Sequence, residues 1–223
     1  LNIRLVVSLC RVLSDLKNAG HEVILVSSGA VSAGLARLGL DHRPRTPEEK
    51  QAVAAVGQSE LMKIYERFFS TYGHTVGQIL MTKDVVDDPV RRAAIENTFE
   101  SLLSLGCVPI VNENDPVSSA QLETKSGDKI SFGDNDTLSA LVAKSCEADL
   151  LVLLSDIDGL YTADPRRDKN AELLSVIEKL TPEIMALGEG KGSSLGTGGM
   201  KTKLHAAEIA TSAGIDMVIA NGS

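Results

Sequence analysis

An excess of basic residues is absent from this sequence. Its 22 lysine and arginine residues are outnumbered by 30 aspartate and glutamate residues, which gives a net charge of −8 and a pI near 5.0. Proteins that bind DNA or RNA neutralise phosphates with clustered Lys and Arg, whereas here these residues are scattered along the chain. We therefore expect no nucleic-acid partner.

Long hydrophobic runs and paired cysteines are absent as well. No apolar stretch approaches the roughly 20 residues that a membrane-spanning helix requires, and no signal peptide is visible, so we expect no membrane partner. The three cysteines, Cys10, Cys107 and Cys146, lie in apolar runs without CxxC spacing. An odd number of such cysteines is typical of small core residues in a reducing compartment, which predicts a cytoplasmic protein. The four histidines lack metal-ligand spacing, so no metal site is predicted.

The chain has enough apolar residues for one full core, because 43% of its 223 residues are hydrophobic. Strand-like and helix-like segments alternate, which predicts an α/β fold with a mainly parallel sheet covered by helices. We expect a single domain over residues 1–223. The expected helices cover residues 3–19, 30–39, 47–69 with a kink or split near Gly57, 88–105, 137–146 and 200–213, and the expected strands cover residues 22–26, 75–81, 107–111, 149–154 and 215–220.

Two clusters of acidic and amide residues flank one polar loop. Asn112 to Asp115 follows the apolar strand Val108 to Val111, and Gly133 to Asp136 opens a helix. Aspartates at a helix N-terminus are favoured by capping and by the helix dipole, which would explain the second cluster alone. Ligands of open α/β sheets bind beyond the carboxyl ends of strands, where the first cluster lies. The pair of clusters favours a ligand site, and capping stays open as the alternative.

Two other junctions have the form of an anion site. Ser27-Ser28-Gly29-Ala30 joins a strand to a helix, and its backbone amides could bind an anion, although N-capping by Ser27 or Ser28 explains it equally well. Gly196 to Gly199 leads into a helix that carries Lys203 one turn later. A flexible linker is the alternative for this loop. Neither a Walker A motif nor GxGxxG occurs.

These segments together predict more than each does alone. The strand ends at residues 27–30, 112–115 and 155–159, together with residues 196–203, would meet at one edge of a sheet. Phosphate-binding amides and a lysine beside a carboxylate-rich pocket indicate phosphoryl transfer to a small polar substrate, while protein kinase and GTPase motifs are absent. Transfer to a carboxylate needs charge stabilisation and positioning but no general base.

The segments VSSGA, AAVGQ, VNEND, FGDND, LSDIDGLYTADP and GTGGMKTK resemble the amino-acid kinase family over essentially the whole chain. VNEND with GDND is similar to the branch that phosphorylates the γ-carboxylate of L-glutamate. The resemblance implies an αβα sandwich with a mainly parallel central sheet, the use of ATP and Mg²⁺, and formation of L-glutamyl 5-phosphate as the first step of proline synthesis. An acetylglutamate- or aspartate-type kinase and a non-catalytic amino-acid-binding regulatory module stay open as alternatives.

The resemblance also implies roles for individual residues, motif by motif. Lys203 would be catalytic, and Asp136 would orient the catalytic lysines. The residues implied in glutamate binding are Ser28, Gly29, Ala30, Asp115, Asp134 and Asn135, and those implied in ATP binding are Ser155, Asp156, Thr197, Gly198, Gly199, Met200, Lys201, Thr202 and Lys203.

The resemblance further implies segments outside the chain. A first strand with a phosphate-binding lysine would precede Leu1, closing strands would follow Ser223, and no C-terminal module of the PUA type lies within residues 1–223. The loop 116–132 is long for the family. Proline is expected as a feedback inhibitor, and the apolar helix from Ala52 to Phe69 is expected to serve a homo-oligomer interface.

Overall fold

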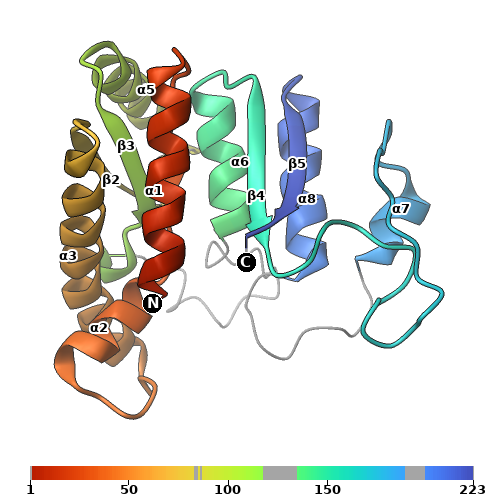
Figure 1. Ribbon diagram of the computed structural model, residues 1–223, viewed down its shortest axis with the longest axis horizontal. Coiled ribbons are helices and arrows are strands. Elements are labelled where there is room, and N and C mark those ends of the chain that lie inside the picture. Colours follow the sequence, from red (N-terminus) through yellow and green to blue (C-terminus); the bar gives the residue numbers. More distant parts are fainter. Residues whose placement is uncertain (1, 83–84, 86, 118–134, 189–198, 223) are drawn as a thin grey trace. The chain divides into compact units, whose positions relative to one another are not determined.

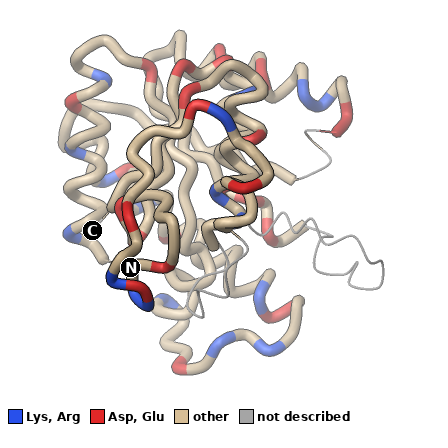
Figure 2. Tube along the Cα trace, turned by 90° about the vertical axis from the view of Figure 1, so that its right-hand side faces the viewer, with Lys and Arg blue, Asp and Glu red and all other residues tan. Residues whose placement is uncertain are grey.

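The computed structural model describes residues 2–82, 85, 87–117, 135–188 and 199–222, shown as coloured ribbon in Figure 1. The chain divides into two compact units, residues 1–132 and 133–223, and each unit is considered by itself. Within the described residues, no helix has both the length and the apolar character needed to cross a membrane. Lys and Arg are interspersed with Asp and Glu along the described trace (Figure 2).

The first unit is built on a three-stranded parallel sheet in the order β1-β3-β2. The strands are β1 Leu25–Val26, β2 Val76–Met81 and β3 Val108–Glu113. The helices are α1 Ile3–Asn18, α2 Ala30–Leu38, α3 Pro47–Thr71 and α5 Pro89–Ser104, and a 3₁₀ turn, η1 Asp115–Val117, follows β3.

Local capping sets the starts of α3 and α5 in this unit. Thr46 accepts a hydrogen bond from the backbone amide of Glu49, and Pro47 occupies the first position of α3. Asp88 accepts hydrogen bonds from the amides of Val90 and Arg91 and so caps α5. These caps confirm the two helix starts that the sequence predicts.

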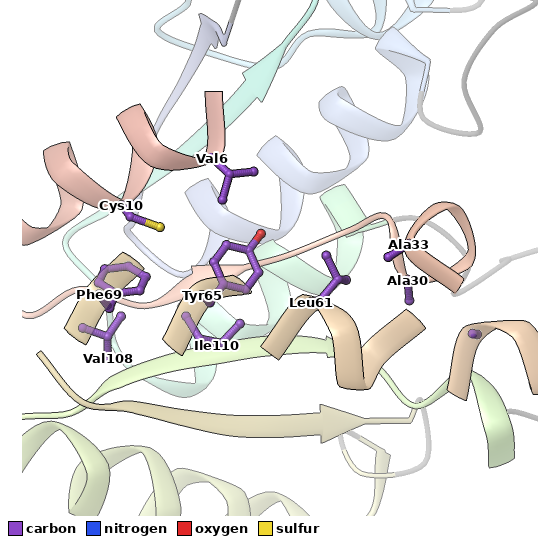
Figure 3. Packing of buried hydrophobic residues seen from close by; sticks show 10 residues of the cluster. Val6, Cys10, Ala30, Ala33, Leu61, Tyr65, Phe69, Val108 and Ile110 are labelled. Carbon is purple, nitrogen blue, oxygen red and sulfur yellow. The ribbon is translucent and has the colours of Figure 1, made fainter. Parts of the chain in front are cut away.

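The core of the first unit lies between α1, α3 and one face of the sheet. Figure 3 shows Cys10 of α1 above Tyr65 and Phe69 of α3, which lie over Val108 and Ile110 of β3. All five side chains are buried. Burial raises the pKa of the Cys10 thiol to about 11, so this cysteine is a neutral core residue, as the sequence indicates.

A close contact between α2 and α3 holds the turn after β1 in place. A Cβ atom on Gly57 of α3 would lie 1.7 Å from the carbonyl oxygen of Ala30 and 2.5 Å from the amide nitrogen of Gly34. Helix α3 runs without interruption through this point, so the expected split near Gly57 is wrong. The glycine serves the close approach of the two helices instead.

The second unit has a two-stranded parallel sheet, β4 Leu150–Ser155 with β5 Asp216–Asn221. Helices α6 Asn135–Ser145 and α8 Met200–Ser212 lie on the same side of these strands (Figure 1), and α7 Pro182–Leu187 packs against α8. The core of the unit contains Ala140, Ala143, Leu151, Leu153, Ala206, Ala210 and Ile215.

Several boundaries differ from those expected. Strand β1 has only two residues, Leu25 and Val26, instead of spanning residues 22–26. Strand β3 continues to Glu113 because β2 continues beside it, with Leu80 opposite Asn112. The first acidic cluster therefore begins inside a buried strand, not after it.

Strand β4 is covered on one face only within the described residues. Leu151 and Leu153 are buried, whereas Leu150, Val152 and Leu154 are 52%, 47% and 51% exposed. Alternate side chains of a strand point to opposite faces, and α6 and α8 cover only one of them.

Gly57→Ala should destabilise the first unit by about 1–3 kcal/mol, because a methyl group at this position overlaps the backbone of α2. In an unobstructed helix interior the same change would stabilise by about 0.5–1 kcal/mol. The measurement is the midpoint of urea unfolding. Ser59→Ala, at an exposed position of the same helix, is the matched control and should change stability by less than about 0.5 kcal/mol. A stabilised Gly57→Ala protein would contradict the close contact.

Candidate functional site

A buried ion pair joins the first turns of α6 and α8. The Nζ atom of Lys203 lies 2.9 Å from Oδ2 of Asp136, and the two side chains are only 9% and 15% exposed. Desolvating an ammonium group is costly unless a partner is held close to it. Asp136 therefore fixes Lys203 in one position. The orienting role that the family resemblance implies for Asp136 in the reaction stays a prediction.

Topology explains why these two residues meet. Helix α6 precedes β4 and α8 precedes β5, and each helix runs antiparallel to the strand that follows it. Both helix N-termini therefore lie at the carboxyl end of the parallel pair β4–β5, where Ser155 is opposite Asn221. This is the edge of an open sheet at which ligands bind.

Helix α8 begins at a glycine. Gly199 is its N-cap residue and makes no side-chain capping hydrogen bond. The hydroxyl of Thr202 lies 2.8 Å from Oδ2 of Asp136 and 2.7 Å from the carbonyl oxygen of Gly199. Since a hydroxyl has one proton, it donates to one of them at a time. A helix N-terminus beside a held lysine is suited to an anion.

The other expected nucleotide-binding residues of this unit are found near the end of β4. Ser155 is the last residue of the strand, and its hydroxyl donates to Asp156 at 3.3 Å. Asp156 is exposed and accepts a 2.6 Å hydrogen bond from the guanidinium of Arg166, which holds the pKa of that carboxyl below its usual range. Arg166 was not predicted as a site residue. A carboxylate followed ten positions later by an arginine gives no local signal.

Three of the predicted site residues lie outside the described residues. Thr197 and Gly198 were expected to bind ATP, and Asp134 was expected to bind glutamate. Met200 and Lys201 lie in the first turn of α8, with Lys201 exposed, and Asn135 begins α6. The structure thus brings Asp136, Thr202 and Lys203 together in the second unit.

In the first unit, the turn after β1 lies beside the end of β3. The amide of Ser27 donates to the carbonyl oxygen of Val111 at 2.8 Å, which continues the parallel pairing of β1 with β3. The turn 27–30 and the cluster 112–115 are therefore neighbours, as the sequence predicts. The convergence expected of residues 155–159 and 196–203 with these segments stays a prediction.

The serine-capping alternative for this turn is wrong. Gly29 is the N-cap residue of α2, with φ of 93°, and it makes no side-chain hydrogen bond. Ser27 is buried, with its hydroxyl 2.8 Å from that of Tyr65, while Ser28 is exposed. The left-handed backbone conformation at position 29 favours glycine. A ligand with hydrogen-bond acceptor atoms could contact Ser28 and the backbone amides of this turn.

A pocket of about 490 Å³ opens between α3 and the ends of β2 and β3. Two of its lining carboxylates are Glu113, which is buried, and Asp115. Burial raises the pKa of Asp115 above its ordinary value, and the positive charge of Lys50 partly offsets this effect. The pocket is lined by Ala54, Ala55, Gln58, Ser59, Met62, Lys63, Glu66, Gln78, Leu80, Glu113, Asp115 and Pro116.

The residues of this pocket that lie on α3 and β2 were missed by the sequence-based prediction. Gln58 belongs to the AAVGQ segment, which carried the family resemblance, but no role was assigned to it. Its side chain receives a 2.8 Å hydrogen bond from the amide of Asn112. A polar residue at an otherwise buried helix position was the available signal.

No group of three or more His, Cys, Asp or Glu side chains in the described part of the chain could hold a metal ion. Magnesium is commonly bound through substrate phosphates with few protein ligands, so we treat Mg²⁺ as part of a nucleotide substrate and assign no residue to it.

Comparison with known proteins agrees with this arrangement. A family model described as the amino acid kinase family matches residues 4–221. Glutamate 5-kinases of Listeria innocua and Clostridium tetani are 54% and 52% identical, covering 100% of this chain and 79% and 80% of their own lengths. Carbamate kinase from Giardia lamblia bound to AMP-PNP has a TM-score of 0.62 at 15% identity, covering 98% of this chain and 85% of its own. Isopentenyl phosphate kinase from T. acidophilum has a TM-score of 0.57 at 17% identity, covering 96% and 80%. The family match over residues 4–221 and the identity to these relatives show that the chain belongs to the amino acid kinase family.

Proposed function

We propose that this protein transfers the γ-phosphoryl group of MgATP to the γ-carboxylate of L-glutamate, which forms L-glutamyl 5-phosphate. The structural observation that carries the proposal is the Asp136–Lys203 pair, which holds a cation at the N-terminus of α8. The choice of acceptor is supported by relatives named glutamate 5-kinase at 49–54% identity over nearly the whole chain.

For this reaction, the protein has to position the two substrates and stabilise the developing charge. A carboxylate acceptor is already ionised at neutral pH, so no base has to remove a proton. Two anions must instead approach each other while charge spreads over the transferred phosphoryl group. Lys203, held by Asp136, is preorganised to neutralise that charge, which is worth more in a site shielded from water.

The nucleotide would be bound by the second unit. The amides that begin α8 can receive phosphate oxygens, and Lys201 and Thr202 lie in the same turn. Ser155 and Asp156 follow β4 at the carboxyl edge of its sheet. Thr197 and Gly198 are proposed to contribute to the same nucleotide site on the family resemblance alone.

Most of the groups proposed to bind the acceptor belong to the first unit. The amides of Gly29 and Ala30, together with Ser28, begin the helix that follows β1 and can receive a carboxylate. Asp115 lines the pocket beside α3 and offers a carboxylate to the α-ammonium group of glutamate. Asn135 and Asp134 are proposed as further acceptor contacts on the family resemblance. Homo-oligomer formation and a cytoplasmic location stay proposals.

A trapping assay tests the reaction directly. The protein is incubated with MgATP, L-glutamate and hydroxylamine, and γ-glutamyl hydroxamate is measured together with ADP release. N-acetylglutamate, aspartate and UMP serve as competing acceptors. Hydroxamate formed only with glutamate supports the proposal, ADP release with another acceptor supports a different kinase of the family, and glutamate binding without ADP release supports a non-catalytic module.

Lys203→Met should lower kcat by about 10²-fold or more, because one preorganised cation is lost from the transition state, while KM for glutamate changes far less. The control is Lys144→Met, which removes an exposed lysine from the last turn of α6 and should leave kcat unchanged. Thermal unfolding of each variant is measured alongside, since Asp136 loses its partner. A folded Lys203→Met protein with near-normal kcat would reject the role of Lys203.

Asp115→Asn should raise KM for glutamate by about 10²–10³-fold, as expected when a desolvated ammonium loses a partner worth about 3–5 kcal/mol. KM for ATP should change little. Because burial raises the pKa of Asp115, KM for glutamate in the wild type should also rise as the pH falls through that raised pKa, where the carboxyl becomes protonated. Glu66→Gln, on the exposed side of the same pocket, is the control. An unaltered KM in Asp115→Asn would show that the ammonium is bound elsewhere.

L-Proline at millimolar concentration should raise the apparent KM for glutamate without lowering kcat. Proline carries an ammonium and a carboxylate on one carbon, as glutamate does, so the group that pairs with the glutamate ammonium can also pair with proline. The measurement is the glutamate dependence of ADP release at several proline concentrations, with D-proline as the control. An identical glutamate dependence with and without L-proline would rule out this form of regulation.

A further inference from the structure

The buried hydroxyl groups of Ser27 and Tyr65 link helix α3 to the turn after β1. The Oγ atom of Ser27 lies 2.8 Å from the phenolic oxygen of Tyr65 and 3.3 Å from the carbonyl oxygen of Ser28. Ser27 and Tyr65 are only 3% and 5% exposed, and the Tyr65 ring lies in the apolar cluster with Phe69 and Ile110 (Figure 3). A hydroxyl buried among apolar side chains costs free energy unless it is hydrogen-bonded, so this link is needed at both of its ends.

These contacts also indicate which hydroxyl is the donor in each hydrogen bond. The carbonyl oxygen of Ser28 only accepts, so the Ser27 hydroxyl donates to it. Because Ser27 has one hydroxyl proton, it accepts in its contact with Tyr65, and the phenol donates. Burial raises the pKa of the Tyr65 phenol, which keeps it protonated and able to donate at neutral pH. The chain of hydrogen bonds therefore runs from Tyr65 to Ser27 and from Ser27 to the backbone of Ser28.

The end of this chain fixes the peptide group between Ser28 and Gly29. In a trans peptide the carbonyl and the amide N–H point in opposite directions, and all peptide bonds of the described residues are trans. Since the carbonyl of Ser28 is directed to the buried Ser27 hydroxyl, the N–H of Gly29 points to the other side of the turn. Gly29 is only partly buried, so a small ligand can reach this amide.

The other end of the turn is held by the same helix. A Cβ atom on Gly57 of α3 would lie 1.7 Å from the carbonyl oxygen of Ala30, which shows how closely α3 packs against the start of α2. Helix α3 thus holds the turn at Ala30 by packing and at Ser27 by a hydrogen bond. Gly29 lies between these two points, and glycine tolerates several backbone conformations. The hydrogen bond from Tyr65 therefore limits rotation of a peptide group that glycine would otherwise allow to turn.

We propose that Tyr65 is a positioning residue for the acceptor site, where it acts through Ser27 to hold the amide of Gly29 in the direction that receives a carboxylate of the acceptor amino acid. This inference rests on the proposed function and adds to it, because the amides of Gly29 and Ala30 are the groups proposed to bind that carboxylate. Tyr65 is buried, so its role requires no contact with the acceptor itself. A donor that is fixed before binding loses little conformational freedom on binding, which favours affinity.

The test interrupts the chain of hydrogen bonds at each of its members. Tyr65→Phe removes the hydroxyl and keeps the ring, and Ser27→Ala removes the next hydroxyl. The dissociation constant for L-glutamate is measured by calorimetry, and KM for ATP is measured from ADP release. Each variant should weaken L-glutamate binding by about 3- to 10-fold, as expected for the loss of one hydrogen bond. KM for ATP should stay within about twofold of the wild type, because the hydroxyls do not belong to the unit proposed to bind the nucleotide.

The double variant tests whether the two hydroxyls act as one chain. Removal of either hydroxyl already releases the carbonyl of Ser28, so removal of both should add little. The dissociation constant of the Ser27→Ala, Tyr65→Phe double variant should therefore lie within about twofold of the weaker single variant. Losses that multiply in the double variant would contradict a shared chain.

Two control variants separate this role from a general loss of stability. Tyr72→Phe makes the same substitution at the C-terminal end of α3, where the side chain is exposed, and it should change neither L-glutamate binding nor the midpoint of urea unfolding. Phe69→Leu disturbs the core of the same helix without removing a hydroxyl. It should lower the unfolding midpoint and yet leave the dissociation constant for L-glutamate within about twofold of the wild type.

Unchanged L-glutamate affinity in folded Tyr65→Phe protein would overturn the inference, and so would an equal loss of affinity in Phe69→Leu. If neither hydroxyl variant folds, wild-type protein labelled with ¹⁵N-glycine decides the matter. The amide signal of Gly29 should shift when L-glutamate is added to saturation, and a Gly29 signal that does not move would reject the contact that Tyr65 is proposed to position.

The same measurements distinguish this inference from the proposed function. A wild type whose L-glutamate binding depends on Tyr65, yet releases no ADP, rejects phosphoryl transfer and keeps the role of Tyr65. An active wild type whose Tyr65→Phe variant keeps its affinity for L-glutamate rejects the role of Tyr65 alone.

Discussion

The second unit depends on one buried ion pair. Lys203 and Asp136 are 67 positions apart in sequence, yet their charged atoms lie 2.9 Å apart where α6 and α8 begin. The attraction offsets the desolvation of both groups only while the helices stay in contact. Small buried side chains, Ala140, Ala206 and Ala210, give that contact its close packing. The pair therefore couples the packing of the unit to the position of a cation, and a change that loosened the helices would also displace the charge.

In the first unit, neutral polar groups hold helix α3 against β3 and the turn after β1. Asn112 lies in the buried end of β3, and its carboxamide links the backbone of Glu113 to Gln58 of α3. Ser27 and Tyr65 make a second buried polar contact between the turn after β1 and the same helix. Such contacts, once fully paired, specify a single arrangement of strand and helix. They also set the geometry of the wall that carries Asp115.

The distribution of charge determines how this acidic protein could bind anionic substrates. The protein carries a net charge of −8, and an anionic nucleotide and an anionic amino acid would both be repelled by an undirected negative surface. Binding them requires cations and hydrogen-bond donors at chosen points, and Lys203 and the amides beginning α8 are the groups proposed for the nucleotide. The carboxylate of Asp115 is proposed to have the converse role toward an ammonium group. Preorganised groups of this kind need not rearrange during the reaction.

The sequence by itself determined most of the helices, the strand positions and the family, because apolar periodicity, caps such as Thr46 and Asp88, and short motifs are local properties. Tertiary structure decided the rest. Strand β3 extends to Glu113 only because β2 pairs with it, Gly57 is needed only because α2 crosses α3, and one face of β4 is exposed because the helices of its unit cover the other. The buried hydrogen bond between Gln58 and Asn112 joins residues 54 positions apart. Contacts between residues so distant leave no periodic or local signal, because they are set by which surfaces the folded chain brings together.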